Sequence, residues 1–293
     1  MPRFVPILLF VTLQTLLATF SMAQTTASAS RNSGQGALPT LEEVLAELKS
    51  REKAAKSVLL EMTSTGWFPG GRTVKTAGTL RVLGKTHVHI KMTADFGDDM
   101  RGQNETVKTP DGVWTREQDP AQGTVCTHMS LELMKQLDDA LTLLGDGREL
   151  PGVPNGIDEA NGSAMIESLQ KSFTLKVERR LVLEGQEFIV LKGPARAGAP
   201  PSEERDLPEP DSVEVLVRPR EWTIAAMRQF KDGKPILEIT ISRLELDRDM
   251  DPASFRIELA EGQKFVAAMA HPPMQAQIEK ILKDAEQKRG QKK

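Results

Sequence analysis

Apolar residues recur at every second position over long stretches, and this period constrains the fold more than any other feature of the chain. From Ser57 onward, Val58, Leu60 and Met62 alternate with Leu59, Glu61 and Thr63. The same period places further apolar residues at Leu80, Val82, Val88, Ile90 and Met92. Because successive side chains of a strand point to opposite faces, these stretches predict an antiparallel sheet that is covered on one face.

Turn signals divide the alternating region into hairpins. Asp111-Gly112 is a hairpin turn signal between Glu105–Thr109 and Val113–Glu117, and another strand is expected at Thr124–His128. A second group of strands is predicted further along the chain, at Phe173–Leu183, Glu187–Lys192, Ser212–Val217, Trp222–Phe230 and Ile236–Leu246.

Helices are expected before, between and after the two groups of strands. Thr40 and Glu43 form a capping-box pattern, which predicts a helix from Leu41 to roughly Lys56. Ser130 can cap a second helix, and a short helix is expected around Ser163–Gln170. From Pro272 onward we expect a charged helix. The second helix has an apolar stripe of Leu133, Met134, Leu137, Leu141 and Leu144. This order of elements predicts an α+β fold.

The first 23 residues have the features of a secretory signal peptide. Arg3 is followed by the apolar stretch Phe4–Phe20 and by Ser21-Met22-Ala23, a small-x-small cleavage site before Gln24. We expect cleavage after Ala23, and since no cysteine lies at this site we expect no lipid anchor. An uncleaved membrane anchor is the alternative. Residues 24–37 are rich in Ser, Thr, Ala and Gly and predict a flexible lead.

Composition and motifs argue against several classes of function. The net charge of −3 gives no sign of the clustered basic excess of nucleic-acid-binding proteins. Cys126 is the only cysteine, so no intramolecular disulfide can form, and we expect a buried, inert thiol. Catalytic and phosphate-binding motifs are missing. Tyr is absent and aromatics make up 4% of residues, so the apolar interior must consist of Leu, Val, Ile and Met.

Two clusters of polar residues admit an alternative interpretation. His87 and His89 alternate on one strand and could chelate a metal, but Lys91 on the same face favours a solvated surface instead. Asp95, Asp98 and Asp99 could supply an acid/base pair to a hydrolase, whereas acidic groups so placed more often lie in a solvated loop. We therefore expect no metal site, no cofactor and no catalytic centre.

The order and spacing of four segments resemble the LolA-like family of periplasmic lipoprotein carriers. These segments are the capped helix leading into Val58–Thr65, the Gly78–Val82 strand, the Val107–Trp114 hairpin with its Asp-Gly turn, and Asp251–Ile257. Together they span roughly Leu38 to Val266. The chain departs from the family at Gly84 and Lys85, where an Arg-Pro pair is common, and at Val88 and Ile90, where the strand is commonly aromatic.

The resemblance implies a curved antiparallel sheet, an incomplete barrel, with helices over its concave face. A single domain is then expected at residues 38–270, with insertions near 145–162 and 193–211, followed by a charged tail at 271–293. The implied function is a noncatalytic, monomeric periplasmic carrier that receives lipid or lipoprotein acyl chains and exchanges them with membrane-bound donor and acceptor proteins. A ligand-free envelope sensor on the same fold is the alternative.

Within that fold, the predicted acyl-chain cavity has two sides. Strands would contribute Val58, Leu60, Met62, Leu80, Val82, Val88, Ile90 and Met92. The helix after Ser130 would contribute Leu133, Leu137 and Leu141 as a lid. Patterning alone, without the resemblance, favours instead a concave face that the helices fill as ordinary core.

Overall fold

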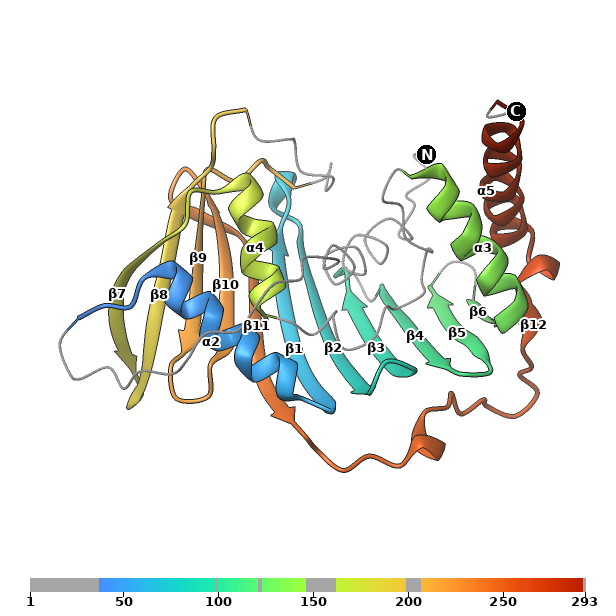
Figure 1. Ribbon diagram of the computed structural model, residues 1–293, viewed down its shortest axis with the longest axis horizontal. Helices are drawn as coiled ribbons and strands as arrows, with labels where there is room; N and C mark the ends of the chain where they lie inside the picture. The colour runs from blue at the N-terminus through green and yellow to red at the C-terminus, as the bar shows by residue number, and fades with distance from the viewer. Residues whose placement is uncertain (1–36, 98–99, 121–122, 146–161, 199–206, 292–293) are drawn as a thin grey trace.

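The structure is a computed structural model that describes residues 37–97, 100–120, 123–145, 162–198 and 207–291. Within these ranges a single open sheet of twelve strands forms, in the order β12-β6-β5-β4-β3-β2-β1-β11-β10-β9-β8-β7. Figure 1 shows this curved sheet with helices toward both of its ends. The α+β fold with an incomplete barrel is confirmed. The predicted signal peptide and most of the flexible lead lie outside the described residues.

The first meander contains six strands. They are β1 Ser57–Trp67, β2 Thr73–Leu83, β3 His87–Asp95, β4 Arg101–Thr109, β5 Gly112–Asp119 and β6 Gly123–Ser130. The predicted hairpin turn at Asp111-Gly112 joins β4 to β5, and Gly112 has a φ of 151°. A β-carbon at Gly112 would lie 2.5 Å from the carbonyl oxygen of Met129, so the close approach of β6 requires glycine.

The second meander pairs with the first through β1 and β11. Its strands are β7 Lys176–Leu183, β8 Gln186–Pro194, β9 Ser212–Arg218, β10 Thr223–Lys231 and β11 Lys234–Leu246. One pair departs from the antiparallel prediction, because β12 Val266–Ala267 runs parallel to β6. A strand of two residues is too short to show a period, so sequence patterning could not reveal it.

Within the described residues, four helices lie on the concave side of the sheet. The predicted capping box begins α2 Leu41–Ala54, where the Thr40 hydroxyl accepts from Glu43 N–H at 3.2 Å and Thr40 N–H donates to Glu43 at 2.8 Å. Ser130 caps α3 Leu131–Leu144 as predicted. The other two are α4 Gly162–Ser172 and α5 Pro272–Gln291. Short 3-10 turns lie at Pro69–Gly71, Pro252–Ser254 and Ala268–Ala270.

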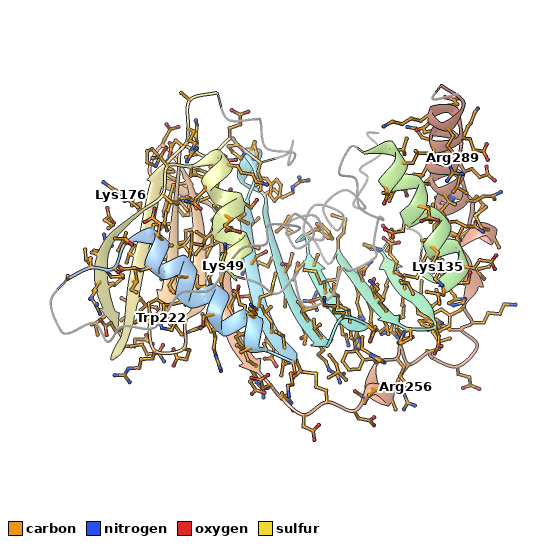
Figure 2. The ribbon with its side chains drawn as sticks, in the orientation of Figure 1. Lys49, Lys135, Lys176, Trp222, Arg256 and Arg289 are labelled. Atoms are coloured by element: carbon orange, nitrogen blue, oxygen red, sulfur yellow. The ribbon has the colours of Figure 1, made fainter. Side chains whose placement is uncertain are left out.

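The helices form two separate pairs. Val44 and Leu48 of α2 and Ile166 of α4 pack over β8–β11, in a core with residues such as Leu191 and Val215. At the other end, α3 and α5 pack on each other and over β5 and β6. Figure 2 shows Lys135 and Arg289 on this second pair and Lys49 and Trp222 at the α2 end.

The last helix is more than the charged tail that its composition predicted. Ile278, Ile281 and Ala285 of α5 are buried against α3. They recur at intervals of three and four residues, which is the spacing of a helical face. Their partner is a helix more than a hundred residues earlier, so the apolar stripe was too narrow to stand out from the surrounding Lys, Gln and Glu.

The segment between β11 and β12 crosses the opposite, convex face of the sheet. We call residues 247–265 the strap (Figure 1). Met250, Phe255 and Ile257 of the strap are buried against Leu59 of β1 and Val107 of β4. The burial of Phe255 shows that the expectation of an interior built only from Leu, Val, Ile and Met was wrong. A residue such as Leu59, on the polar side of an alternating strand, is therefore also buried. The strap therefore buries convex-face residues of the first meander where it crosses the sheet.

Candidate functional site

The eight strand residues predicted to line a cavity lie together on the concave face. They form one cluster, in which each side chain is at most 8% exposed, and Ile241, Leu244 and Leu246 of β11 pack against them. We call this cluster the central patch. Its members are Val58, Leu60, Met62, Leu80, Val82, Val88, Ile90 and Met92.

Among the described residues, only strand side chains make up the central patch. Every residue in the cluster comes from β1, β2, β3 or β11. The α2–α4 pair packs over the strands on one side of it, and the α3–α5 pair over those on the other. Figure 1 shows β1 to β4 between the two helical pairs. The patch is therefore a continuous apolar cluster on the concave face, between two helix-covered regions.

The three predicted lid residues lie elsewhere. Leu137 and Leu141 are buried in the cluster that α3 forms with α5, and Leu133 packs against the same cluster. Sequence reasoning placed these leucines and the eight strand residues around one cavity. The structure brings the strand residues together and joins the leucines to Ile278 and Ile281 instead. The periodicity of a helix gives its apolar face but not the surface that this face covers.

A small cavity lies at one edge of the central patch, beneath the ends of α2 and α4. Its volume is about 30 Å³. Ligand pockets for drug-sized molecules occupy about 300–1,000 Å³. An acyl chain could enter here only if α2 and α4 moved away from the sheet. The lining residues are Arg51, Glu52, Ala55, Val58, Leu60, Gly162, Trp222, Thr223, Ile224, Ile241, Leu244 and Leu246.

Glu52 links the two helices at the rim of this cavity. Its carboxylate accepts hydrogen bonds from Ser163 N–H, at 2.9 Å, and from the Ser163 hydroxyl. It thereby satisfies an amide in the first turn of α4 that the helix itself leaves unpaired. Burial raises the pKa of Glu52 above its ordinary value of 4.5, although the hydrogen bonds from Ser163 and Gly162 partly oppose this effect. Lys49 and Glu167 form an ion pair that also joins α2 to α4.

The side chains on the concave face change from apolar on β3 to polar on β4. Pairing places Val88 opposite Lys108, Ile90 opposite Thr106 and Met92 opposite Asn104. Further across, Thr106 pairs with Thr115 and Thr115 with Thr127. Sequence reasoning missed these polar residues. In β4 the apolar Val107 suggests that its own face of the strand is the concave one. Val107 in fact lies on the convex face, where the strap covers it.

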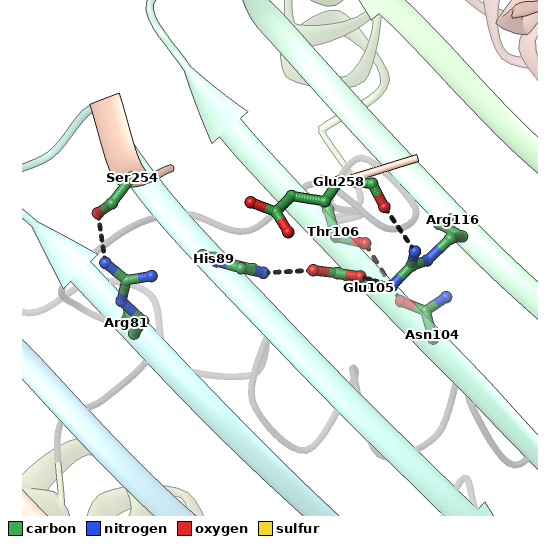
Figure 3. Close-up of polar contacts among 8 residues, drawn as sticks. All are labelled: Arg81, His89, Asn104, Glu105, Thr106, Arg116, Ser254 and Glu258. Carbon is green, nitrogen blue, oxygen red and sulfur yellow. Dashed lines mark hydrogen bonds and ion pairs between the residues drawn. The ribbon is translucent and has the colours of Figure 1, made fainter. Parts of the chain in front are cut away.

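The convex face beneath the strap carries a charged network, shown in Figure 3. Glu105 of β4 lies 2.8 Å from His89 Nε2 and forms an ion pair with Arg116 of β5. Arg116 also donates to the Glu258 carbonyl of the strap at 2.8 Å. Burial raises the pKa of Glu105, but the His89 hydrogen bond and the charges of Arg116 and Lys91 outweigh it and hold the pKa below 4.5.

These contacts account for the histidines that could have bound a metal. His89 is engaged by Glu105, and His87 packs edge-on against Phe255 of the strap, with ring centroids 5.4 Å apart. In the part of the chain that the structure describes, His, Cys, Asp and Glu side chains form no group of three or more suited to a metal ion. Asp95 lies 3.6 Å from Arg101, whereas Asp98 and Asp99 lie outside the described residues.

Cys126 is buried on β6, as predicted, and burial raises the pKa of its thiol although Arg116 opposes this. A thiol with a raised pKa is a poor nucleophile.

Among the described residues, every helix is too short or too polar to traverse a lipid bilayer.

Comparison by sequence finds no family model and no curated protein that matches the chain. Solved structures do match. An uncharacterised conserved protein from Thermus thermophilus is 10% identical with a TM-score of 0.41, over 77% of this chain and 98% of that one. A Vibrio parahaemolyticus domain assigned to outer membrane lipoprotein sorting is 10% identical with a TM-score of 0.30, over 73% and 94%.

A third match is the complex of MucA and MucB from Pseudomonas aeruginosa. It is 11% identical with a TM-score of 0.38, over 74% of this chain and 60% of that one. The similarity in all three cases is one of fold. The function therefore has to be argued from the site.

Proposed function

We propose that this protein is a noncatalytic carrier that binds lipid acyl chains on the central patch and is exported to the periplasm. The observation that supports the proposal is the central patch itself. Eight apolar strand residues form one continuous cluster on the concave face between two helical pairs, and the small cavity beneath the ends of α2 and α4 adjoins this cluster at Val58 and Leu60. Covering such a surface with an acyl chain is favourable by about 0.8 kcal/mol per buried CH₂ group.

The small cavity supports a mechanism in which binding requires movement. Because its volume of about 30 Å³ is far below that of a chain-sized pocket, the α2–α4 pair would have to shift before a chain could extend past Leu60 and Leu244. Apolar contacts have no directional preference, so a chain held this way can be released to an acceptor that buries it better. Lipoprotein acyl chains are one cargo of this kind.

Gly78 offers a direct test, because it lies on the concave face between Met62 and Met92. A β-carbon there would be 3.4 Å from the Met92 side chain, which is an ordinary contact. We expect Gly78→Leu to place a side chain where an acyl chain would lie and to weaken binding of a fluorescent C16 fatty acid at least about tenfold, or 1.4 kcal/mol. Ala77→Leu is the control, because Ala77 is exposed and lies next in sequence on the opposite face.

Native mass spectrometry of the detergent-free protein provides the second measurement. We expect wild-type protein to retain or take up acyl lipids and Gly78→Leu to lose them. A wild-type protein that never carries lipid, or equal affinities of the two leucine variants for the probe, would show that the carrier proposal is wrong.

The small size of the cavity also favours a second candidate, a ligand-free sensor or interaction module. In that case the concave face is a filled core, and the protein acts through a protein partner. The same experiment separates the two functions, because a sensor of this kind would fold normally, carry no lipid and bind no fatty-acid probe.

A further inference from the structure

One row of directly paired residues crosses the concave face from β11 to β6. Leu244, Leu60, Leu80 and Ile90 make up its first half. Thr106, Thr115 and Thr127 make up its second half. Neighbouring strands lie about 4.8 Å apart, so the row forms a line of side chains with an apolar end and a hydroxyl end.

We propose that Thr115 and Thr127, with Thr106 beside them, bind the uncharged polar group of a lipid whose acyl chain lies on the central patch. This inference rests on the proposed function and extends it to the chemical class of the ligand. The polar group would contain hydroxyl or amide groups, such as those of an acylglycerol or an N-acyl linkage.

The hydrogen-bonding capacities of the three threonines support this class of ligand. Thr106 is fully buried and donates its hydroxyl hydrogen to Asn104 Oδ1 at 3.2 Å, so towards a ligand it can only accept. The described residues give the Thr115 and Thr127 side chains no hydrogen bond, so both can donate. Hydroxyl and amide groups offer a donor and an acceptor together, whereas a hydrocarbon offers neither.

The charges beside the row favour an uncharged group. Lys108 flanks the row on β4 and Glu117 flanks it on β5, so the two neighbouring rows contribute one basic and one acidic residue. Burial, together with the nearby Asp119, raises the pKa of Glu117, although His271 opposes this. Surroundings that disfavour the charge of Glu117 disfavour a charged ligand group for the same reason.

The apolar end of the row gives the ligand a direction. Leu60 and Leu244 line the small cavity beneath α2 and α4. The tail of the chain would therefore point toward the α2–α4 pair, and the polar group would lie over β4 to β6, toward the α3–α5 pair.

The double substitution Thr115→Val and Thr127→Val tests the proposal, since valine keeps the branched shape and removes only the hydroxyls. Displacement of a fluorescent C16 fatty acid would measure affinity for monopalmitoylglycerol, for palmitate and for hexadecane delivered from cyclodextrin. We expect the double variant to bind monopalmitoylglycerol about tenfold more weakly, as the loss of one to two hydrogen bonds predicts. Its affinity for hexadecane should change less than about twofold.

Two controls exclude a merely structural effect. Thr79→Val removes a hydroxyl from the opposite face of β2 and should leave all affinities unchanged. Replacing both Thr115 and Thr127 by Ser keeps the hydroxyls and should retain the wild-type preference for monopalmitoylglycerol.

Three results would overturn the proposal. The first is an equal loss of affinity for monopalmitoylglycerol and hexadecane in the valine variant. The second is a wild-type protein that binds hexadecane as tightly as monopalmitoylglycerol, which would leave the carrier proposal standing. The third is a larger loss for palmitate than for monopalmitoylglycerol, which would indicate a charged ligand group. A wild-type protein that binds none of the three probes would refute the carrier function as well.

Discussion

At the scale of single residues, Glu52 shows how an acidic side chain becomes a tertiary cap. It lies in the last turns of α2, yet its hydrogen-bond partners belong to Ser163 at the start of α4. Glycine at position 162 permits this contact, since a β-carbon there would lie 2.9 Å from Ile224 and 3.4 Å from the Glu52 carboxylate. The local sequence around Glu52 contains no sign of this role, because the partner is more than a hundred residues away.

The raised pKa of Glu52 predicts a pH dependence of stability. The folded state holds the proton to higher pH than the unfolded state does, so the free energy of unfolding falls as the pH rises from about 4.5 through the raised pKa. We expect Glu52→Gln to remove this fall and to make the protein more stable than wild type at pH 7 but not at pH 4. Urea unfolding at a series of pH values measures the effect.

Glu47→Gln serves as the control, because Glu47 lies on the same helix whereas the Ser163 amide and hydroxyl donate to Glu52. It should leave the wild-type pH dependence in place. A Glu52→Gln variant that is less stable than wild type at pH 7 would show that the hydrogen bonds to Ser163 outweigh the cost of burying the charge.

At the scale of elements, α3 illustrates the difference between an amphipathic face and its partner. The stripe of Leu137 and Leu141 predicted a helix that covers apolar surface, and the helix is present with its Ser130 cap. Its main partner is α5, together with Val113 and Met129 of the adjacent strands. The α3–α5 pair thus forms a small core of its own at one end of the sheet.

Because this core is separate from the central patch, a substitution within it should lower the stability of the protein without weakening ligand binding. Leu137 is 1% exposed, so we expect Leu137→Ala to lower the free energy of unfolding by about 2–5 kcal/mol. Hydrogen exchange should speed up in α3 and α5 together, while affinity for the C16 probe should change less than about twofold. Leu131→Ala, at a position on the same helix that is 40% exposed, is the control. A loss of affinity as large as that of Gly78→Leu would show that α3 contacts the chain directly.

At the scale of the whole molecule, the strap joins the interior strand β11 to one edge of the sheet across the convex face. It leaves β11, which pairs with β1, and reaches β12, which pairs with β6 at the far edge. Phe255 of the strap is buried, and the Arg81 guanidinium lies 4.9 Å from the centre of the Phe255 ring. Arg116 then connects the strap to Glu105 (Figure 3).

Removing Arg116 should therefore weaken the whole fold. In an Arg116→Met variant the buried Glu105 loses its main cation, and we expect the free energy of unfolding at pH 7 to fall by about 3 kcal/mol. Because the pKa of Glu105 is lowered in the folded state, the stabilisation by Arg116 depends on pH. The stabilisation is present above about pH 4.5 and is lost as the pH falls below it, so the difference between variant and wild type should shrink at pH 3.5.

Arg256→Met is a suitable control, since Arg256 lies on the strap itself but its side chain is 71% exposed. Thermal or urea unfolding of both variants measures the difference. Equal, small effects of the two substitutions would mean that the strap is held by its apolar contacts alone.

Local sequence was enough to predict the elements and much of their register within hairpins. Period-two alternation identified β1 to β3, the Asp111-Gly112 turn fixed the pairing of β4 with β5, and hydroxyl side chains marked the starts of α2 and α3. These features depend on side chains a few residues apart, so local chemistry suffices to predict them. The same alternation placed the eight strand residues of the central patch on one face of the sheet.

Which surfaces meet, by contrast, depends on contacts between distant parts of the chain. The pairing of β1 with β11, the contact of α3 with α5 and the crossing of the strap over Val107 all join segments far apart in sequence. The strap buries residues on the convex face as well, so apolar residues occur on both faces of these strands. For this reason sequence patterning did not show that Thr106, Thr115 and Thr127 lie in a row on the concave face. Burial on both faces removes the contrast between polar and apolar sides on which a reading by periodicity depends.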